Sequence, residues 1–206
     1  MATISVRGQG TAWVQPDEVT VGLSAEALLP TASEAFAEAT RLAADLVLLC
    51  DEIGVPAGSR TTSQVSLAEH GEHTDTGWQH RGYRASTRVA ARLSDADLAS
   101  RLASEAAARL EVRIDGPTWR VARDNTAHGE ARRRAAEDAR SRAEEYAAVL
   151  GGRVGAIASI AEPGSGPPLP AARMYAVRQE ISPMPLEAGE HEVMAEVDVT
   201  FQLEQG

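Results

Sequence analysis

The densest group of side chains that could do chemistry lies between residues 69 and 80. This segment reads EHGEHTDTGWQH and holds His70, His73 and His80 among two glutamates and an aspartate. Imidazole and carboxylate groups at such short spacing are ligands that zinc and nickel accept. The spacing is not that of a helix presenting two histidines, and the polar composition predicts a loop between two strands. Metal binding and plain solvent exposure of these histidines are therefore two open interpretations.

A set of arginines follows directly along the chain. Arg84, Arg88 and Arg92 recur at every fourth residue in the segment 82–93, where apolar and polar side chains alternate. Alternation with a period of two is typical of a strand with one buried face, so the three arginines share its other face. That face has to meet solvent, acidic side chains or another subunit. We therefore treat the three arginines as the candidate interface.

Other catalytic signals are weak. GxSxG, the P-loop pattern and GxGxxG do not occur in the sequence. Cys50 is the only cysteine and follows a run of leucine and valine, which predicts a small buried side chain rather than a reactive thiol. Asp95 and Asp97 lie at a predicted helix start, where carboxylates favour the helix dipole. We expect no catalytic residue and no cofactor, and an enzyme of unknown reaction is only a third hypothesis.

Three helices are predicted to position these groups. A capping box at Thr31 and Glu34 opens the first helix, and Gly54 ends it. Ser94 is the expected N-cap of a shorter second helix. The third begins at Asp124 or Asn125, ends at Leu150 and repeats alanine at every fourth residue, which predicts one face packed closely against a neighbour.

Strands are predicted from alternating segments, with Gly8-Gln9-Gly10 separating the first two and Asp115-Gly116-Pro117 forming a turn or bulge. The segment 163–170, with four prolines, is expected to be irregular, and Pro183-Met184-Pro185 to be a rigid break. The long strands near 80–93 and 192–203 are the ones expected to expose sheet edges. The predicted strands are 3–7, 11–15, 19–27, 61–67, 82–93, 112–114, 118–122, 154–161, 175–181 and 192–203.

The order of elements from residue 17 onwards predicts the fold class. Strand, helix, strand, strand, helix and strand follow one another, as in a split βαβ, ferredoxin-like unit. Alternating strands favour an antiparallel sheet with helices on one face. We therefore predict an α+β protein with a mainly antiparallel sheet, two long helices and one shorter helix. Residues 1–206 are expected to form a single domain, with 1–122 and 123–206 as candidate sub-units.

Charge and hydropathy restrict the classes of partner. The chain of 206 residues has 20 arginines, no lysine and 30 acidic residues, for a net charge of −10. Such a surface argues against general binding of nucleic acid or anionic membranes, because phosphate contacts need positive charge. No apolar run approaches the ~20 residues of a membrane span. The N-terminus lacks the pattern of a secretory signal, so the expected location is the cytoplasm.

Several short segments together resemble the SIMPL-domain family, which is named for a mammalian signalling adaptor and is common among uncharacterised bacterial proteins. The resemblance implies an α+β domain that often self-associates, with bacterial members commonly in the periplasm or envelope and loosely linked to stress. It implies no catalytic residues. The segments that carry it are ISVRGQG at 4–10 with Pro16-Asp17, IGVP at 53–56, GYRAS at 82–86, DARSRAE at 138–144, LGGRVG at 150–155 and PMPLEAG at 183–189.

Two hypotheses of function follow from the sequence. The first is a non-enzymatic SIMPL-type assembly or interaction protein, a homo-oligomer that acts through its surface on an unknown protein partner. The alternative is a protein that binds a metal or small ligand through the histidine-rich segment 69–80 and the proline-rich segment that follows residue 162. A ring of subunits would favour the first hypothesis, and a closed pocket with convergent polar groups would favour the second.

Overall fold

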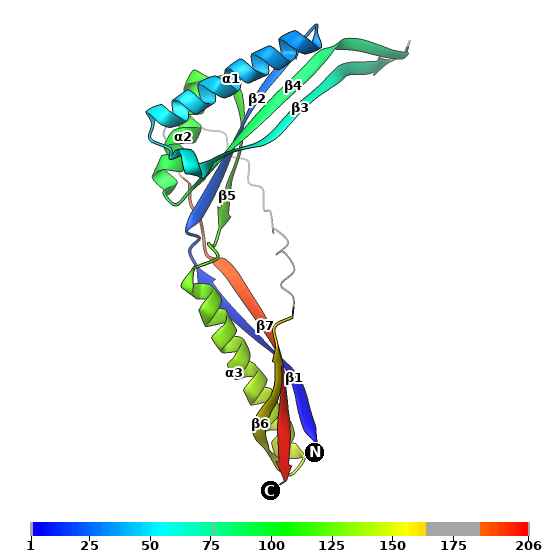
Figure 1. Cartoon of the computed structure of the whole chain (residues 1–206), viewed down its shortest axis with the longest axis vertical. Coiled ribbons are helices and arrows are strands. Elements are labelled where there is room, and N and C mark those ends of the chain that lie inside the picture. The colour runs from blue at the N-terminus through cyan, green and yellow to red at the C-terminus, as the bar shows by residue number, and fades with distance from the viewer. Residues whose placement is uncertain (1, 76, 164–185, 206) are drawn as a thin grey trace. The chain divides into compact units, whose positions relative to one another are not determined.

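The computed structural model describes residues 2–75, 77–163 and 186–205 (Figure 1). Contacts divide this chain into two compact units. The first unit contains 2–16, 121–163 and 189–205, and the second contains 17–75, 77–120 and 186–188. The change of unit after residue 120 lies near the expected sub-unit boundary at 122, whereas residues 2–16 are grouped with the C-terminal part of the chain.

The second unit has the predicted order of strands and helices. Its four strands pair antiparallel in the order β3-β4-β2-β5, which places two sequentially distant strands at the centre, as in a split βαβ unit. The predicted α+β class with antiparallel sheets is confirmed. The elements are β2 (Glu18–Leu29), α1 (Ala32–Glu52), a 3₁₀ turn (Ala57–Ser59), β3 (Arg60–Thr74), β4 (Gly77–Leu93), α2 (Ala96–Arg109) and β5 (Val112–Arg120).

Helices α1 and α2 cover one face of this sheet. Their apolar seams join Val21, Leu23 and Val89 of the strands in the main core cluster, where Leu46 and Leu102 are fully buried. The Thr31 hydroxyl accepts from the backbone N–H of Glu34 at 3.3 Å, which confirms the predicted cap of α1. The cap of α2 is Asp95 rather than Ser94, because the Asp95 carboxylate accepts from the backbone N–H groups of Asp97 and Leu98, the second and third residues of the helix.

The segment 69–80 is a hairpin and not the predicted loop. Strand β3 continues to Thr74 and β4 starts at Gly77, with Glu72 opposite Gln79 and His73 opposite Trp78. Strand β2 pairs with β4 only as far as Tyr83, so the distal part of the hairpin has two strands (Figure 1). Polar composition misled the prediction because both faces of a two-stranded ribbon are exposed to solvent.

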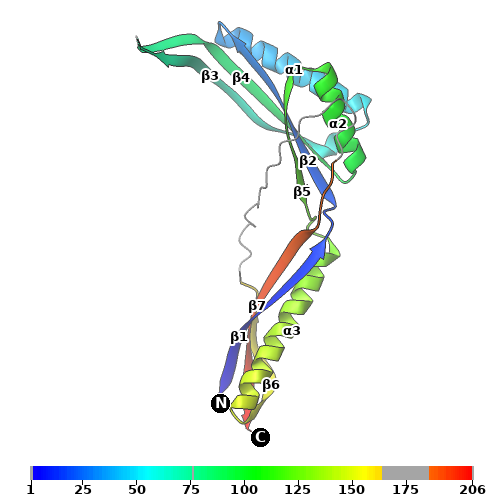
Figure 2. The ribbon, with the colours of Figure 1, turned by 180° about the vertical axis from the view of Figure 1, so that it is seen from behind.

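The first unit is a three-stranded antiparallel sheet in the order β1-β7-β6, with one long helix on one face (Figure 2). The predicted alanine stripe is buried at every fourth residue from Ala127 to Ala147. Asn125 caps the helix by accepting from the Ala127 backbone N–H at 2.8 Å. The elements are β1 (Thr3–Val14), α3 (Thr126–Val149), β6 (Gly152–Ala161) and β7 (His191–Gln205).

Strand β1 is continuous, where the sequence predicted two strands divided at Gly8-Gln9-Gly10. Each glycine lies against the α3 backbone: a Cβ on Gly8 would come within 2.0 Å of the Ala135 carbonyl oxygen, and one on Gly10 within 2.1 Å of that of Ala131. The glycines therefore permit close packing of helix on strand and do not form a turn.

The edges of the two sheets differ from the prediction. Strands β4 and β7, whose edges were expected to be exposed, are internal, and the edge strands are β1, β3, β5 and β6. The segments predicted at 112–114 and 118–122 form the single strand β5, with the register shift of a bulge between them. The predicted strand at 175–181, the break at 183–185 and positions 164–170 lie outside the described residues.

None of the helices among the described residues combines the length and hydropathy that crossing a membrane requires. This finding agrees with the absence of a long apolar run in the sequence.

Candidate functional site on the open face of the sheet

The face of the β3-β4-β2-β5 sheet that α1 and α2 leave uncovered carries the predicted arginines. On β2, odd-numbered residues such as Val21 and Leu23 are buried under the helices, so even-numbered residues point to the other face. The register extends this open face to the neighbouring strands. Its charged residues are Arg84, Arg88 and Arg92 of β4, Arg113, Asp115 and Arg120 of β5, and Glu18 and Glu26 of β2.

Arg88 crosses the central strand β2 to reach β5. Its Nη1 lies 3.0 Å from Oδ2 of Asp115, and the Nε of Arg113 donates to Oδ1 of the same carboxylate at 3.1 Å. The crossing passes over Gly22, where a Cβ would come within 2.4 Å of Arg88 Nη2. One carboxylate is thus shared by two guanidinium groups in the middle of the open face.

The other two predicted arginines are less constrained. Arg84 lies 4.0 Å from a carboxylate oxygen of Glu26, at the limit of an ion pair, and its side chain is half exposed. Arg92 is exposed opposite Thr20 and forms no ion pair with any residue in the described ranges. Both guanidinium groups are therefore accessible to a partner surface, whereas Arg88 is occupied within the sheet.

The three predicted histidines do not converge. His73 packs edge-on against Trp78 with ring centroids 5.3 Å apart, and His80 packs edge-on against Tyr83 at 5.1 Å. His70 lies opposite Gly82 in the register. Across residues 2–75, 77–163 and 186–205, no three His, Cys, Asp or Glu side chains are placed to hold one metal ion. Metal binding by these histidines stays a prediction that this arrangement does not support.

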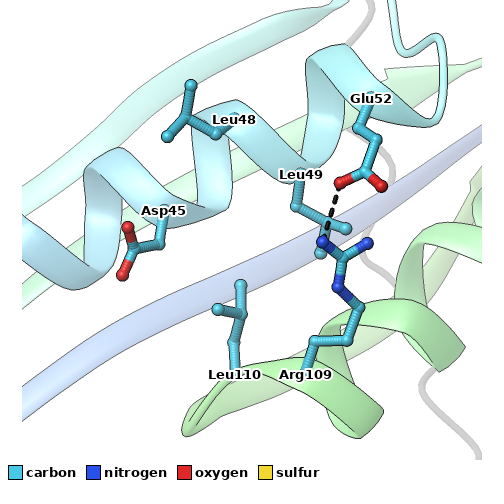
Figure 3. Close-up of a pocket in the computed structure, with 6 residues that line it drawn as sticks. All are labelled: Asp45, Leu48, Leu49, Glu52, Arg109 and Leu110. Carbon is cyan, nitrogen blue, oxygen red and sulfur yellow. Dashed lines mark hydrogen bonds and ion pairs between the residues drawn. The ribbon is translucent and has the colours of Figure 1, made fainter.

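A shallow hollow lies between α1 and the C-terminal end of α2 (Figure 3). Leu49 and Leu110 form its floor, and the Arg109 and Glu52 side chains meet in an ion pair of 2.7 Å at one end. The hydrogen bond from Arg109 lowers the pKa of Glu52. With about 230 Å³ it is smaller than the roughly 300–1,000 Å³ typical of ligand pockets.

The single thiol is buried, as predicted. Cys50 has no exposed surface and belongs to the core cluster under α1. Burial raises the pKa of this thiol, which disfavours the reactive thiolate.

Sequence reasoning missed Asp115, Arg113 and Gly22. Asp115 was assigned to a turn or bulge, and the register shift places it directly opposite Gly22. Glycine inside an alternating strand was the available signal, because such a position often marks the close approach of another group.

Comparison with known proteins adds one finding. A family model described as "SIMPL: Protein of unknown function (DUF541)" matches residues 4–201. No curated protein matches the chain.

Proposed function

The chain belongs to the SIMPL family, and from this premise we propose that it is a non-enzymatic interaction protein whose copies assemble with one another. The family description gives no activity, so the proposal rests on the surface of the second unit. The observation that carries it is the open face of the four-stranded sheet, where Arg84 and Arg92 are exposed.

The distribution of charge indicates which surface of a second copy would bind the open face. Five arginines and three acidic residues lie on the open face, although the whole chain has a net charge of −10. Helix α1, on the opposite side of the same sheet, has five acidic residues and one arginine. The open face of one copy and the acidic helix of a second copy are therefore complementary, and such complementarity favours encounter and fixes orientation.

The local chemistry supports binding rather than catalysis. Asp115, the most enclosed carboxylate of the open face, is held by two guanidinium groups and is not positioned as a general base. The one thiol is buried, and the histidines of the hairpin pack against aromatic rings. Function would then depend on exposed arginines that meet a partner's carboxylates.

Native mass spectrometry of the untagged protein tests this proposal. We expect species heavier than the 21.8 kDa monomer, and we expect Arg84→Glu/Arg92→Glu to remove the largest of them. These two side chains are exposed, so the substitution should not disturb folding. Arg132→Glu/Arg140→Glu on α3, with side chains that are 60% and 69% exposed, is the matched control and should assemble like the wild type.

A wild-type protein that remains monomeric at about 100 µM would contradict self-assembly. Functional interfaces of standard size have dissociation constants well below that concentration. Equal loss of assembly in both charge-reversed variants would point to net charge rather than to the basic face.

A further inference from the structure

Strand β3 has a long free edge that carries no charge and no proline over residues 61–68, and its register shifts lie at the ends of the stretch 64–70, between Thr62 and Gln64 and between His70 and Gly71. It pairs only with β4, and no residue from 60 to 74 belongs to a core cluster of the described structure. Residues 61–68 read TTSQVSLA and contain no charge and no proline. From Gln64 to His70 the register with β4 is uninterrupted. Natural proteins protect such edges with charges, prolines, bulges or covering segments.

The free edges of β1, β5 and β6 are protected in one of these ways. On β1, α3 supplies partners to the free backbone: Asp138 accepts from the Gln9 N–H at 2.9 Å, and Arg134 donates to the Thr11 carbonyl oxygen at 2.6 Å. Strand β5 has a bulge, a proline and alternating charges. Strand β6 is uncharged from 154 to 161, but two register shifts interrupt its pairing. Strand β3 thus has the longest regular free edge among the described strands.

An uncovered apolar strip lies beside this edge on the helix side of the sheet. Leu67 is opposite Ala85, which α1 buries, so Leu67 and Val65 point to the helix side, yet they are 45% and 58% exposed. Helix α1 therefore covers β2 and β4 but stops short of β3.

The flank of α1 nearest to β3 is also uncharged from Phe36 to Val47, one turn before Asp51 pairs with Arg60. Phe36, Thr40, Ala43 and Val47 recur at intervals of three and four residues and form one stripe. Arg60, the first residue of β3, donates to the Val47 carbonyl oxygen at 3.1 Å, which places this stripe beside the strand. Phe36 and Val47 are 45% and 42% exposed. The ion pairs of Arg41 with Glu38 and Asp45 lie on the other side of the helix.

We propose that a second copy of this chain pairs with β3 in antiparallel orientation about a twofold axis. The two sheets would form one eight-stranded sheet, and the two α1 stripes would pack over the junction and cover Val65 and Leu67 of both copies. This inference rests on the proposed self-assembly and adds an isologous contact to the contact between the arginine face and α1. A twofold contact of one patch with itself closes the pair and leaves no free β3 edge.

The size and charge of this surface fit a second copy. Seven regular residues extend about 24 Å at ~3.4 Å per residue. Strand and helix layers of about 10 Å each give a face of roughly 480 Å² per copy, or about 1,000 Å² in total, at the lower limit of specific interfaces. Glu69 is the only acidic residue of the stretch 64–70, so this strip limits the like-charge repulsion that two chains of net charge −10 would otherwise experience.

Sedimentation velocity over a concentration series tests the proposal with Val65→Glu/Leu67→Glu. Both side chains are exposed in the single chain, so the variant should fold, which circular dichroism and thermal unfolding would verify. Four new carboxylates at the junction should raise the dissociation constant of the dimer roughly tenfold or more, because like charges facing each other across strands repel. Val149→Glu/Leu150→Glu on α3, where the side chains are 87% and 65% exposed, should dimerise like the wild type.

Cysteine cross-linking supplies a positive signal. Pairing of residues 64–70 with the same residues of a second copy puts the twofold axis at Leu67, so Leu67→Cys should form a disulfide-linked dimer under mild oxidation. Val65→Cys and Val149→Cys should not, because disulfides require Cα atoms about 4.4–6.8 Å apart. A dimer that persists in Val65→Glu/Leu67→Glu, or that does not cross-link through Leu67→Cys, would overturn the β3 pairing while self-assembly itself stands. A wild-type chain that is monomeric throughout the series would overturn both.

Discussion

At the residue scale, Gly8 and Gly10 determine how closely α3 approaches β1. A methyl group at either position would overlap backbone atoms of the helix, which cannot rotate away as a side chain can. Gly22 is a contrasting case, since its nearest neighbours are the terminal atoms of the Arg88 side chain. The first pair sets packing between elements, and the third glycine lets an ion pair cross a strand.

We predict that Gly10→Ala destabilises the protein by about 2 kcal/mol or more, because overpacking against a rigid backbone typically costs 1–3 kcal/mol. Gly129→Ala is the matched control on α3 itself. Nothing lies within 4 Å of a Cβ at that exposed helical position, so alanine should stabilise by about 0.5–1 kcal/mol. Urea unfolding of both variants measures the difference, and a neutral Gly10→Ala would contradict the close packing.

At the element scale, α3 covers one face of the β1-β7-β6 sheet. It also forms hydrogen bonds with two backbone groups on the free edge of β1. The Asp138 carboxylate accepts from the Gln9 backbone N–H and pairs with Arg142 at 2.9 Å. These interactions lower the pKa of Asp138, the hydrogen bond from Gln9 most of all. One acidic side chain of a helix thereby closes an edge that could otherwise pair with another chain.

A depressed carboxyl pKa stabilises the folded state above the unfolded pKa, about 3.9 for aspartate, and this contribution is lost as the pH falls through the folded value. Asp138→Asn should therefore lower the free energy of unfolding at pH 7 by about 1 kcal/mol or less. The difference from wild type should disappear as the pH falls through the lowered pKa of Asp138, because the protonated aspartic acid is then neutral like asparagine.

Urea unfolding at several pH values measures this difference. Glu145→Gln, an exposed substitution on the same helix, is the control and should show little effect at any of them. A deficit of Asp138→Asn that persists undiminished in acid would show that the charge is not the cause.

At the scale of the whole molecule, the second unit interrupts the first along the chain. Strand β1 pairs with β7 over Thr3–Val14, so the two ends of the chain complete one sheet. Between them, β2 begins beside the end of β5, where Glu18 is opposite Arg120. A segment whose two ends are adjacent in one sheet has the topology of an inserted domain.

We predict that residues 17–120 fold when expressed alone, because their main core cluster draws all its buried members from this segment. Among the residues that the structure describes, the partly buried Leu186 is the one neighbour of that cluster that the fragment would lack, so a modest loss of stability is expected. Circular dichroism and cooperative urea unfolding provide the measurement. A fragment without a cooperative transition would show that the second unit depends on the rest of the chain.

Much of the fold was predictable because local patterns determine it. The Thr31 cap of α1, the alanine stripe of α3 and the alternation of β4 each depend only on residues within one element. The structure confirms all three. The order of elements also predicted the split βαβ unit. The hairpin at 69–80 was missed because a two-stranded ribbon has no buried face, and the long β1 was divided because its glycines resemble a turn.

The sequence alone determined the α+β class, the family resemblance and the common face of Arg84, Arg88 and Arg92, since all three depend on residue order and spacing. The tertiary structure decided which strands form the sheet edges. It also decided that Asp115 forms ion pairs with two arginines, and that the three histidines do not converge on one site. These properties depend on which strands become neighbours. Strand pairing joins residues far apart in the chain, and a periodicity within one segment carries no information about the register between two.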